Sequence, residues 1–176
     1  MRATRVLTVA CASLALGVCI GLSAKDKLPG FSILQGKPPK EAGAAALQEA
    51  EHLAGNGSWE LIAIARVWYL AGDHAKAQSL IDRALSHKPK ATDFQRVGEI
   101  FAAAGDNAQA ETYYQRALAA DPKDDTGQSE IGAWYIRSGQ REKGEELLAK
   151  ALAKNPDDLW HYVRASEAYL NVPPGR

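Results

Sequence analysis

From about residue 40 to residue 170, apolar residues return at intervals of three and four along the chain. Phe94, Val97 and Phe101 share one side of a helix, and Tyr114 and Ala117 share one side of the next. This spacing is the period of amphipathic α-helices. The pattern therefore predicts an all-α fold of short helices, each packed through its apolar side.

These helices are grouped by a repeat of about 34 residues, a period typical of stacked helical hairpins. The turn glycines Gly72, Gly105 and Gly139 mark this interval, and a proline follows each of them at a constant distance. Hairpins stack because one hairpin cannot bury its apolar side alone. Other positions return in the same register, namely the small residues Ala65, Gly98 and Gly132, the small residues Ala77, Ala110 and Gly144, and the aromatic residues Trp68, Phe101 and Tyr135.

Each recurring position has a physical role. Glycine suits the end of a first helix because it adopts a left-handed backbone without a Cβ clash. Proline stops a second helix because its ring clashes with the preceding turn. Asp73, Asp106 and Ser58 are predicted N-caps, and Thr92 with Gln95 predicts a capping box at the start of the second unit.

These positions resemble the tetratricopeptide repeat family, with well-matched units at 58–90, 91–124 and 125–158. The resemblance implies an α-solenoid, a right-handed superhelical stack of helix hairpins with a concave groove. Two departures are mild. Gln128 stands where the family has a bulky apolar residue, and Gly144 stands where it has alanine.

The array is expected to begin and end with a half-repeat. Residues 40–57 fit a second helix, and residues 159–176 fit a first helix followed by a tail. Half-units suit the ends because a terminal repeat has one neighbour. Trp59 and Trp160 occupy equivalent positions in the first and last units, where they either anchor a partner or pack the terminal half-units.

The N-terminus has the parts of an export signal. Arg2 and Arg5 precede an uncharged run over 6–24 that ends in small residues, as in a cleaved signal peptide. The run is also long enough to cross a bilayer as an uncleaved membrane anchor, and a lipoprotein signal at Cys19 is a third alternative. We expect a linker at 25–39 and an exported folded part, either periplasmic or secreted, or anchored to the inner membrane and outside the cytoplasm.

Composition and residue spacing argue against a nucleic-acid-binding, catalytic or metal-binding site in the folded part. The 21 Lys and Arg residues balance the 21 Asp and Glu residues, so the basic excess of a nucleic-acid-binding protein is missing. Both cysteines, Cys11 and Cys19, lie in the N-terminal apolar run. The histidines do not pair at helical spacing, and 121–127 lacks the ligand order of a calcium loop and is expected to be an inter-repeat turn. We therefore expect no catalytic residue, no metal and no cofactor.

The resemblance implies that a protein or peptide partner lies against the first helices. The residues expected in the groove are Trp59, Ile62, Arg66, Tyr69, Gln95, Glu99, Ser129, Ile136, Val163 and Glu167. The function expected is that of a non-enzymatic interaction scaffold in envelope complex assembly, which contacts a membrane through the N-terminal segment if that remains uncleaved. The alternatives are a self-associating structural spacer and a membrane-tethered assembly factor of the kind used in cytochrome or pilus biogenesis.

Overall fold

The computed structural model describes residues 30–175. The predicted signal or anchor at 1–24 lies outside the described residues. Within them the chain is helical and contains no strand. The elements are η1 (Gly30–Ile33), α1 (Pro39–Ala54), α2 (Ser58–Leu70), α3 (His74–Ala84), α4 (Ala91–Ala103), α5 (Asn107–Ala120), α6 (Asp125–Arg137), α7 (Arg141–Lys154) and α8 (Leu159–Tyr169).

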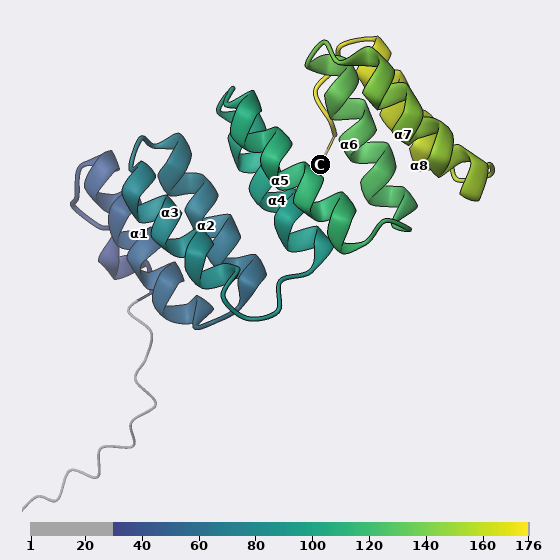
Figure 1. Cartoon of the computed structure of the whole chain (residues 1–176). Helices are drawn as coiled ribbons and strands as arrows, with labels where there is room; N and C mark the ends of the chain where they lie inside the picture. Colours follow the sequence, from purple (N-terminus) through teal and green to yellow (C-terminus); the bar gives the residue numbers. More distant parts are fainter. Residues whose placement is uncertain (1–29, 176) are drawn as a thin grey trace, which may run out of the picture.

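Three helical hairpins form the body of the molecule. Helix α2 packs on α3, α4 on α5 and α6 on α7, and the pairs follow one another in a curved row (Figure 1). Helix α1 packs against α2 at one end, and α8 packs mainly against α6 at the other. The prediction of an all-α solenoid of hairpins is confirmed.

The turns inside the hairpins are built as the glycine spacing predicts. Gly72, Gly105 and Gly139 have φ angles of 91°, 80° and 86°, in the left-handed region that favours glycine. Asp73 accepts a hydrogen bond from the backbone N–H of Lys76 at 3.0 Å, and Asp106 caps its helix in the same way. Both predicted aspartate N-caps are confirmed.

Close helix crossings need residues without bulk. A Cβ atom added to Gly144 would lie 2.5 Å from the carbonyl oxygen of Gly132, and one added to Gly98 would lie 2.7 Å from the Tyr114 ring. Around these crossings the buried side chains form one core, which runs through the three hairpins and includes Leu61, Ala65, Leu80, Ile81, Val97, Ile100, Phe101, Tyr113, Tyr114, Ile131, Trp134 and Tyr135.

The predicted capping box at Thr92 and Gln95 is wrong, and so is the predicted N-cap at Ser58. Asp93 caps α4 instead, because its carboxylate accepts from the backbone N–H of Lys90 at 2.9 Å. Ser58 is the first residue of α2, and its hydroxyl donates to Asp93 at 3.0 Å. Asp93 therefore caps its own helix α4 and also joins that helix to Ser58 of the preceding hairpin.

Candidate functional site

The first helices α2, α4, α6 and α8 form one continuous row, and each contacts the next along the stack. Side chains along this row form the surface on which a partner is expected. We call this surface the first-helix face. It is defined by Trp59, Arg66 and Tyr69 of α2, Glu99 of α4, Glu130, Ile136 and Arg137 of α6, and Val163, Arg164 and Glu167 of α8.

A chain of polar contacts crosses this face at its C-terminal end. The Gln95 amide donates to the carboxylates of Glu130 and, at 3.4 Å, Glu99. Arg164 forms ion pairs with Glu130 at 3.5 Å and with Glu167 at 2.7 Å. Three successive first helices are thus joined by the buried Gln95 and by the accessible pair of Glu130 and Arg164.

The C-terminal tail continues the same chain of contacts. The backbone N–H of Gly175 donates to Glu167 at 3.0 Å. Burial opposes ionisation of Glu167, but the hydrogen bonds from Gly175 and Arg164 outweigh it and lower the pKa of this carboxyl. In Figure 1 the tail turns back from the end of α8 toward α6. An extended backbone segment therefore already lies against part of the first-helix face.

Two arginines of this face have unused hydrogen-bond donors. Arg137 ends α6, and its Nη1 is buried without a hydrogen-bond partner among the described residues. Burial lowers the pKa of the Arg137 guanidinium, against the opposing influence of Tyr114 and Glu167. Arg66 of α2 has a buried Nε that also makes no hydrogen bond within the described chain. Unused buried donors of a charged group are costly unless an acceptor reaches them.

The N-terminal end of the face is aromatic. The Trp59 side chain is 52% exposed, and the Arg96 guanidinium lies 3.5 Å from the centre of its ring. This cation–π contact holds the indole ring in place and leaves its other surface open. Tyr69 is partly buried beside His74 and Phe101.

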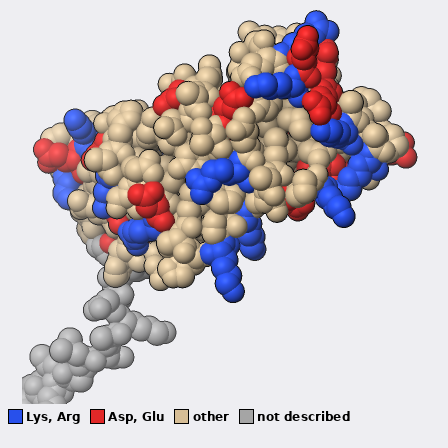
Figure 2. Space-filling view, viewed as in Figure 1, with Lys and Arg blue, Asp and Glu red and all other residues tan. Residues whose placement is uncertain are grey.

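The opposite side of the array is joined by simple ion pairs. Glu51 of α1 pairs with Lys76 and Arg83 of α3, and Glu111 of α5 pairs with Lys143 of α7. Each pair links one second helix to the next. Figure 2 shows acidic and basic side chains interspersed with large uncharged areas on the visible face of the molecule. Charges of this kind neutralise one another along the stack.

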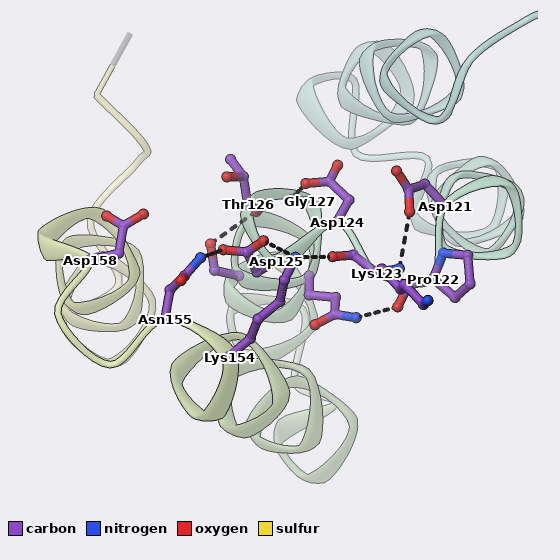
Figure 3. Close-up of polar contacts among 12 residues, drawn as sticks. Asp121, Pro122, Lys123, Asp124, Asp125, Thr126, Gly127, Lys154, Asn155 and Asp158 are labelled. Atoms are coloured by element: carbon purple, nitrogen blue, oxygen red, sulfur yellow. Dashed lines mark hydrogen bonds and ion pairs between the residues drawn. The ribbon is translucent and has the colours of Figure 1, made fainter.

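The turn before α6 forms a second polar cluster (Figure 3). Asp125 accepts from Lys154 at 2.7 Å and from Asn155, and its carboxylate lies 3.3 Å from Nε2 of the buried His161. Oxygen atoms of Asp125 and Asp158 and a ring nitrogen of His161 lie within 4.8 Å of one another, close enough to hold a cation. Because Lys154 and Asn155 already bind the Asp125 carboxylate, this cluster acts as a joint that fixes α8 to α6 and α7.

Known proteins share this arrangement of helices. A family model described as tetratricopeptide repeat matches residues 101–167. Among solved structures, the chain is similar to the crystal structure of MamA, with 17% sequence identity over 75% of this chain and 80% of that chain, and a TM-score of 0.53. No curated protein matches the sequence.

The match over residues 101–167, together with the stacked hairpins, supports assignment to the tetratricopeptide repeat family. The family match supports a protein–protein interaction scaffold, whereas the likeness to MamA shows the fold. Within residues 30–175, none of the helices has both the length and the apolar character that crossing a bilayer requires.

The packing of the repeats changes the set of residues that a partner can reach. Ile62, Gln95 and Ser129 are expected in the groove from the sequence, but their side chains are buried. Successive first helices pack so closely that side chains on the flank of one helix fill the contact with the next. The other predicted residues remain accessible, since Trp59 and Glu99 are exposed and Arg66, Tyr69, Ile136, Val163 and Glu167 are partly exposed.

Three residues of the first-helix face are not among the predicted groove residues. They are Glu130, Arg137 and Arg164. Glu130 and Arg164 occupy the same position in successive repeats and have opposite charges. Opposite charges at one repeat position are the sequence signal that could have predicted their pairing. Arg137 has no such signal, because it interacts electrostatically with Tyr114 of the preceding hairpin and Glu167 of α8, which only the fold brings near it.

Proposed function

We propose that this repeat protein is a non-enzymatic scaffold that binds an extended segment of a partner protein along the first-helix face. The observation that carries the proposal is the half-buried guanidinium of Arg137, whose Nη1 has no acceptor within the described chain. A carboxylate or a backbone carbonyl of a partner would supply that acceptor. Such charge-assisted hydrogen bonds contribute about 1.5–3 kcal/mol each.

The tail supports an extended binding mode. Residues 172–175 have no regular secondary structure, and the backbone N–H of Gly175 already bonds to Glu167. Arg137 and Glu167 interact electrostatically at this place. A partner segment would use the same acceptor and donor side by side, with its backbone N–H groups on Glu167 and its oxygen atoms on Arg137.

The aromatic end of the face adds an apolar contact. The exposed ring of Trp59 lies on α2 with Arg66, whose Nε also has no partner in the described chain. A partner segment running from α8 to α2 would thus meet a guanidinium at both ends. Tryptophan and arginine are the residues that most often dominate protein–protein binding energy.

The site of action is proposed to be outside the cytoplasm, in the assembly of an envelope complex. Arg2, Arg5 and the uncharged run over 6–24 support this proposal. Fractionation of expressing cells, followed by sequencing of the mature N-terminus, tests it. A soluble protein beginning near residue 25 supports a cleaved signal, and an intact N-terminus in the membrane fraction supports the tethered assembly factor. An intact chain in the cytoplasm contradicts the proposal.

Binding is tested by cross-linking and affinity capture from the native cell envelope, with mass spectrometry of the captured proteins. The variants are Arg137→Gln, Arg66→Ala and Trp59→Ala. Lys150→Ala is the control, because Lys150 lies on α7 and pairs with Glu146. We expect a specific partner to fall about tenfold or more with Arg137→Gln, and to stay unchanged with the control. If all four variants capture the same partner equally well, the first-helix face does not bind that partner.

A further inference from the structure

Exposed large apolar side chains are confined to the two ends of the described chain. At the N-terminal end they are Phe31, Leu53, Trp59, Val67 and Leu70, and at the C-terminal end they are Leu159, Trp160, Tyr162, Tyr169, Leu170 and Val172. The described residues 71–158 between them contain none. A solenoid that ends in water normally has polar outer surfaces on its terminal repeats. Apolar ends indicate that something covers them.

Among the described residues, α8 is a first helix on which no second helix packs. Tyr162, Ser166 and Tyr169 of α8 occupy the repeat positions of Phe94, Gly98 and Phe101. In the complete hairpin the second helix covers that side, and Phe101 is 3% exposed. Tyr169 is 51% exposed at the equivalent place. The hairpin side of α8 is therefore open within the described chain.

At the other end of the described residues, α1 is a second helix on which no first helix packs. Gly43 of α1 occupies the repeat position of Ala77, Ala110 and Gly144, where a first helix crosses closely. All three of those residues are buried, but a Cβ atom added to Gly43 would meet nothing within 4 Å. Glycine inside a helix costs about 0.5–1 kcal/mol relative to alanine. Nothing in the described chain requires that cost at this position, whereas a crossing helix would.

Helix α2 also has a side chain that is exposed although its equivalents in the other repeats are buried. Val67 occupies the repeat position of Ile100, Trp134 and Ala168, which are all buried, and Trp134 packs on Tyr114 of the preceding hairpin. Val67 is 44% exposed. Within the described chain, no preceding first helix contacts α1 and α2.

We propose that α8 of one copy and α1 of a second copy form a complete hairpin, so that the protein assembles head to tail. Each end supplies the half that the other end lacks, and Ser166 would face Gly43 as Gly132 faces Gly144. Helix α2 of the second copy then packs on α8, and Val67 becomes buried. The contact continues the packing already present between successive hairpins in the chain.

Such a contact joins two different surfaces, so it does not close on itself as a two-fold dimer does. Heterologous contacts of this kind produce open chains of subunits unless the rotation closes a ring. The first-helix faces of successive copies would then form one longer surface. This inference does not depend on the proposed peptide binding.

Sedimentation equilibrium of the full chain, as processed by the expressing cell, tests the assembly. We expect the average mass of the wild-type protein to rise past that of a dimer as concentration increases. Gly43→Gln blocks the N-terminal end and Ser166→Arg blocks the C-terminal end, so each variant alone should remain monomeric. Their equimolar mixture should form a dimer and nothing larger, since each variant keeps the end that the other lacks.

Two control variants and the choice of substitution make the result decisive. Gln115→Arg changes an exposed residue of the central helix α5 and should assemble like the wild type. Gly43→Gln fits open space and raises helix propensity, so misfolding would not explain its loss of assembly. Arg137→Gln, which tests the proposed function, should leave the average mass unchanged.

Several outcomes would overturn the head-to-tail contact. A wild-type protein that stays monomeric at all concentrations contradicts it. Self-association that survives in Gly43→Gln alone indicates a two-fold contact through α8. A Gly43→Gln chain that is monomeric like the wild type but less stable indicates that the chain's own N-terminal residues cover α1.

Discussion

Two buried polar residues, Asp93 and His161, join successive hairpins at the same repeat position, the third residue of a first helix. Each meets the first residue of the preceding first helix, since Asp93 accepts from Ser58 and His161 lies beside Asp125. At one joint the carboxylate belongs to the third residue, Asp93, and at the other it belongs to the first residue, Asp125. Buried polar groups are tolerated when they are hydrogen-bonded, and these pairs fix how far one hairpin turns relative to the next.

We expect Asp93→Ala to lower the free energy of unfolding by about 1–3 kcal/mol, because the backbone N–H of Lys90 and the hydroxyl of Ser58 lose their acceptor. Asp93→Asn keeps an acceptor oxygen and should recover part of the loss. Urea unfolding followed by circular dichroism measures both. Equal stability of Asp93→Ala and the wild type would show that the bridge contributes nothing.

Asp125 should make stability depend on acid pH. Hydrogen bonds from Lys154 and Asn155 hold the pKa of this carboxyl well below its usual range in the folded chain, whereas an unfolded aspartate has a pKa of about 3.9. The stabilisation is therefore complete above the unfolded pKa, and it is lost as pH falls through that value toward the folded pKa.

The test compares urea midpoints of the wild type and Asp125→Asn at about pH 6 and about pH 3. Asp125→Asn should be less stable near neutral pH and should lose less stability on acidification. Glu51 and Glu111, whose pKa values are also lowered by their lysine partners, are present in both proteins. The difference between the two proteins therefore reports on Asp125. Parallel pH dependence would contradict the prediction.

At the scale of the helix, glycine has opposite consequences at equivalent places. Gly144 lies where two backbones touch, because an added Cβ would come within 2.5 Å of the Gly132 carbonyl oxygen and of an Ile136 side-chain carbon. Gly43 lies at the same repeat position with open space around it. The identity of the residue is the same, and its neighbours decide what it does.

Alanine substitution separates the two cases. Gly144→Ala should destabilise the protein by about 1–3 kcal/mol, because the backbone oxygen cannot move aside easily. Gly43→Ala should stabilise the isolated chain by about 0.5–1 kcal/mol through helix propensity. Thermal or urea unfolding in dilute solution measures both changes. A stabilised Gly144→Ala protein would show that the crossing is looser than the structure describes.

At the scale of the whole molecule, burial is greatest in the middle of the array. None of the α1 side chains is fully buried, while α4 and α6 each have several buried residues. Stability in a repeat array is approximately the sum of each repeat and its contacts with neighbours. The ends, with one neighbour each, should open more often than the centre.

Hydrogen exchange should therefore be fastest in α1 and α8 and slowest in α4 and α6. In concentrated solution, head-to-tail contact should slow exchange at both ends and leave the centre unchanged. Mass spectrometry of exchanged peptides at two protein concentrations measures this. Protection of α1 equal to that of α4 in dilute solution would contradict the expectation for the ends.

The sequence by itself determined the helices, the hairpin repeat and the turns. These features depend on spacing within one hairpin, such as a left-handed glycine at Gly72 followed by the capping Asp73. The family resemblance also indicated the row of helices on which a partner is expected.

The tertiary structure alone decided which residues of that row are accessible and which pair with one another. Ile62 and Ser129 are buried and Asp93 bridges two hairpins because these properties depend on the distance between helices that belong to different repeats of the chain. Local periodicity specifies which side of a helix is apolar. It does not specify how closely the next hairpin approaches, and that approach determines burial, ion pairing and the donors left free for a partner.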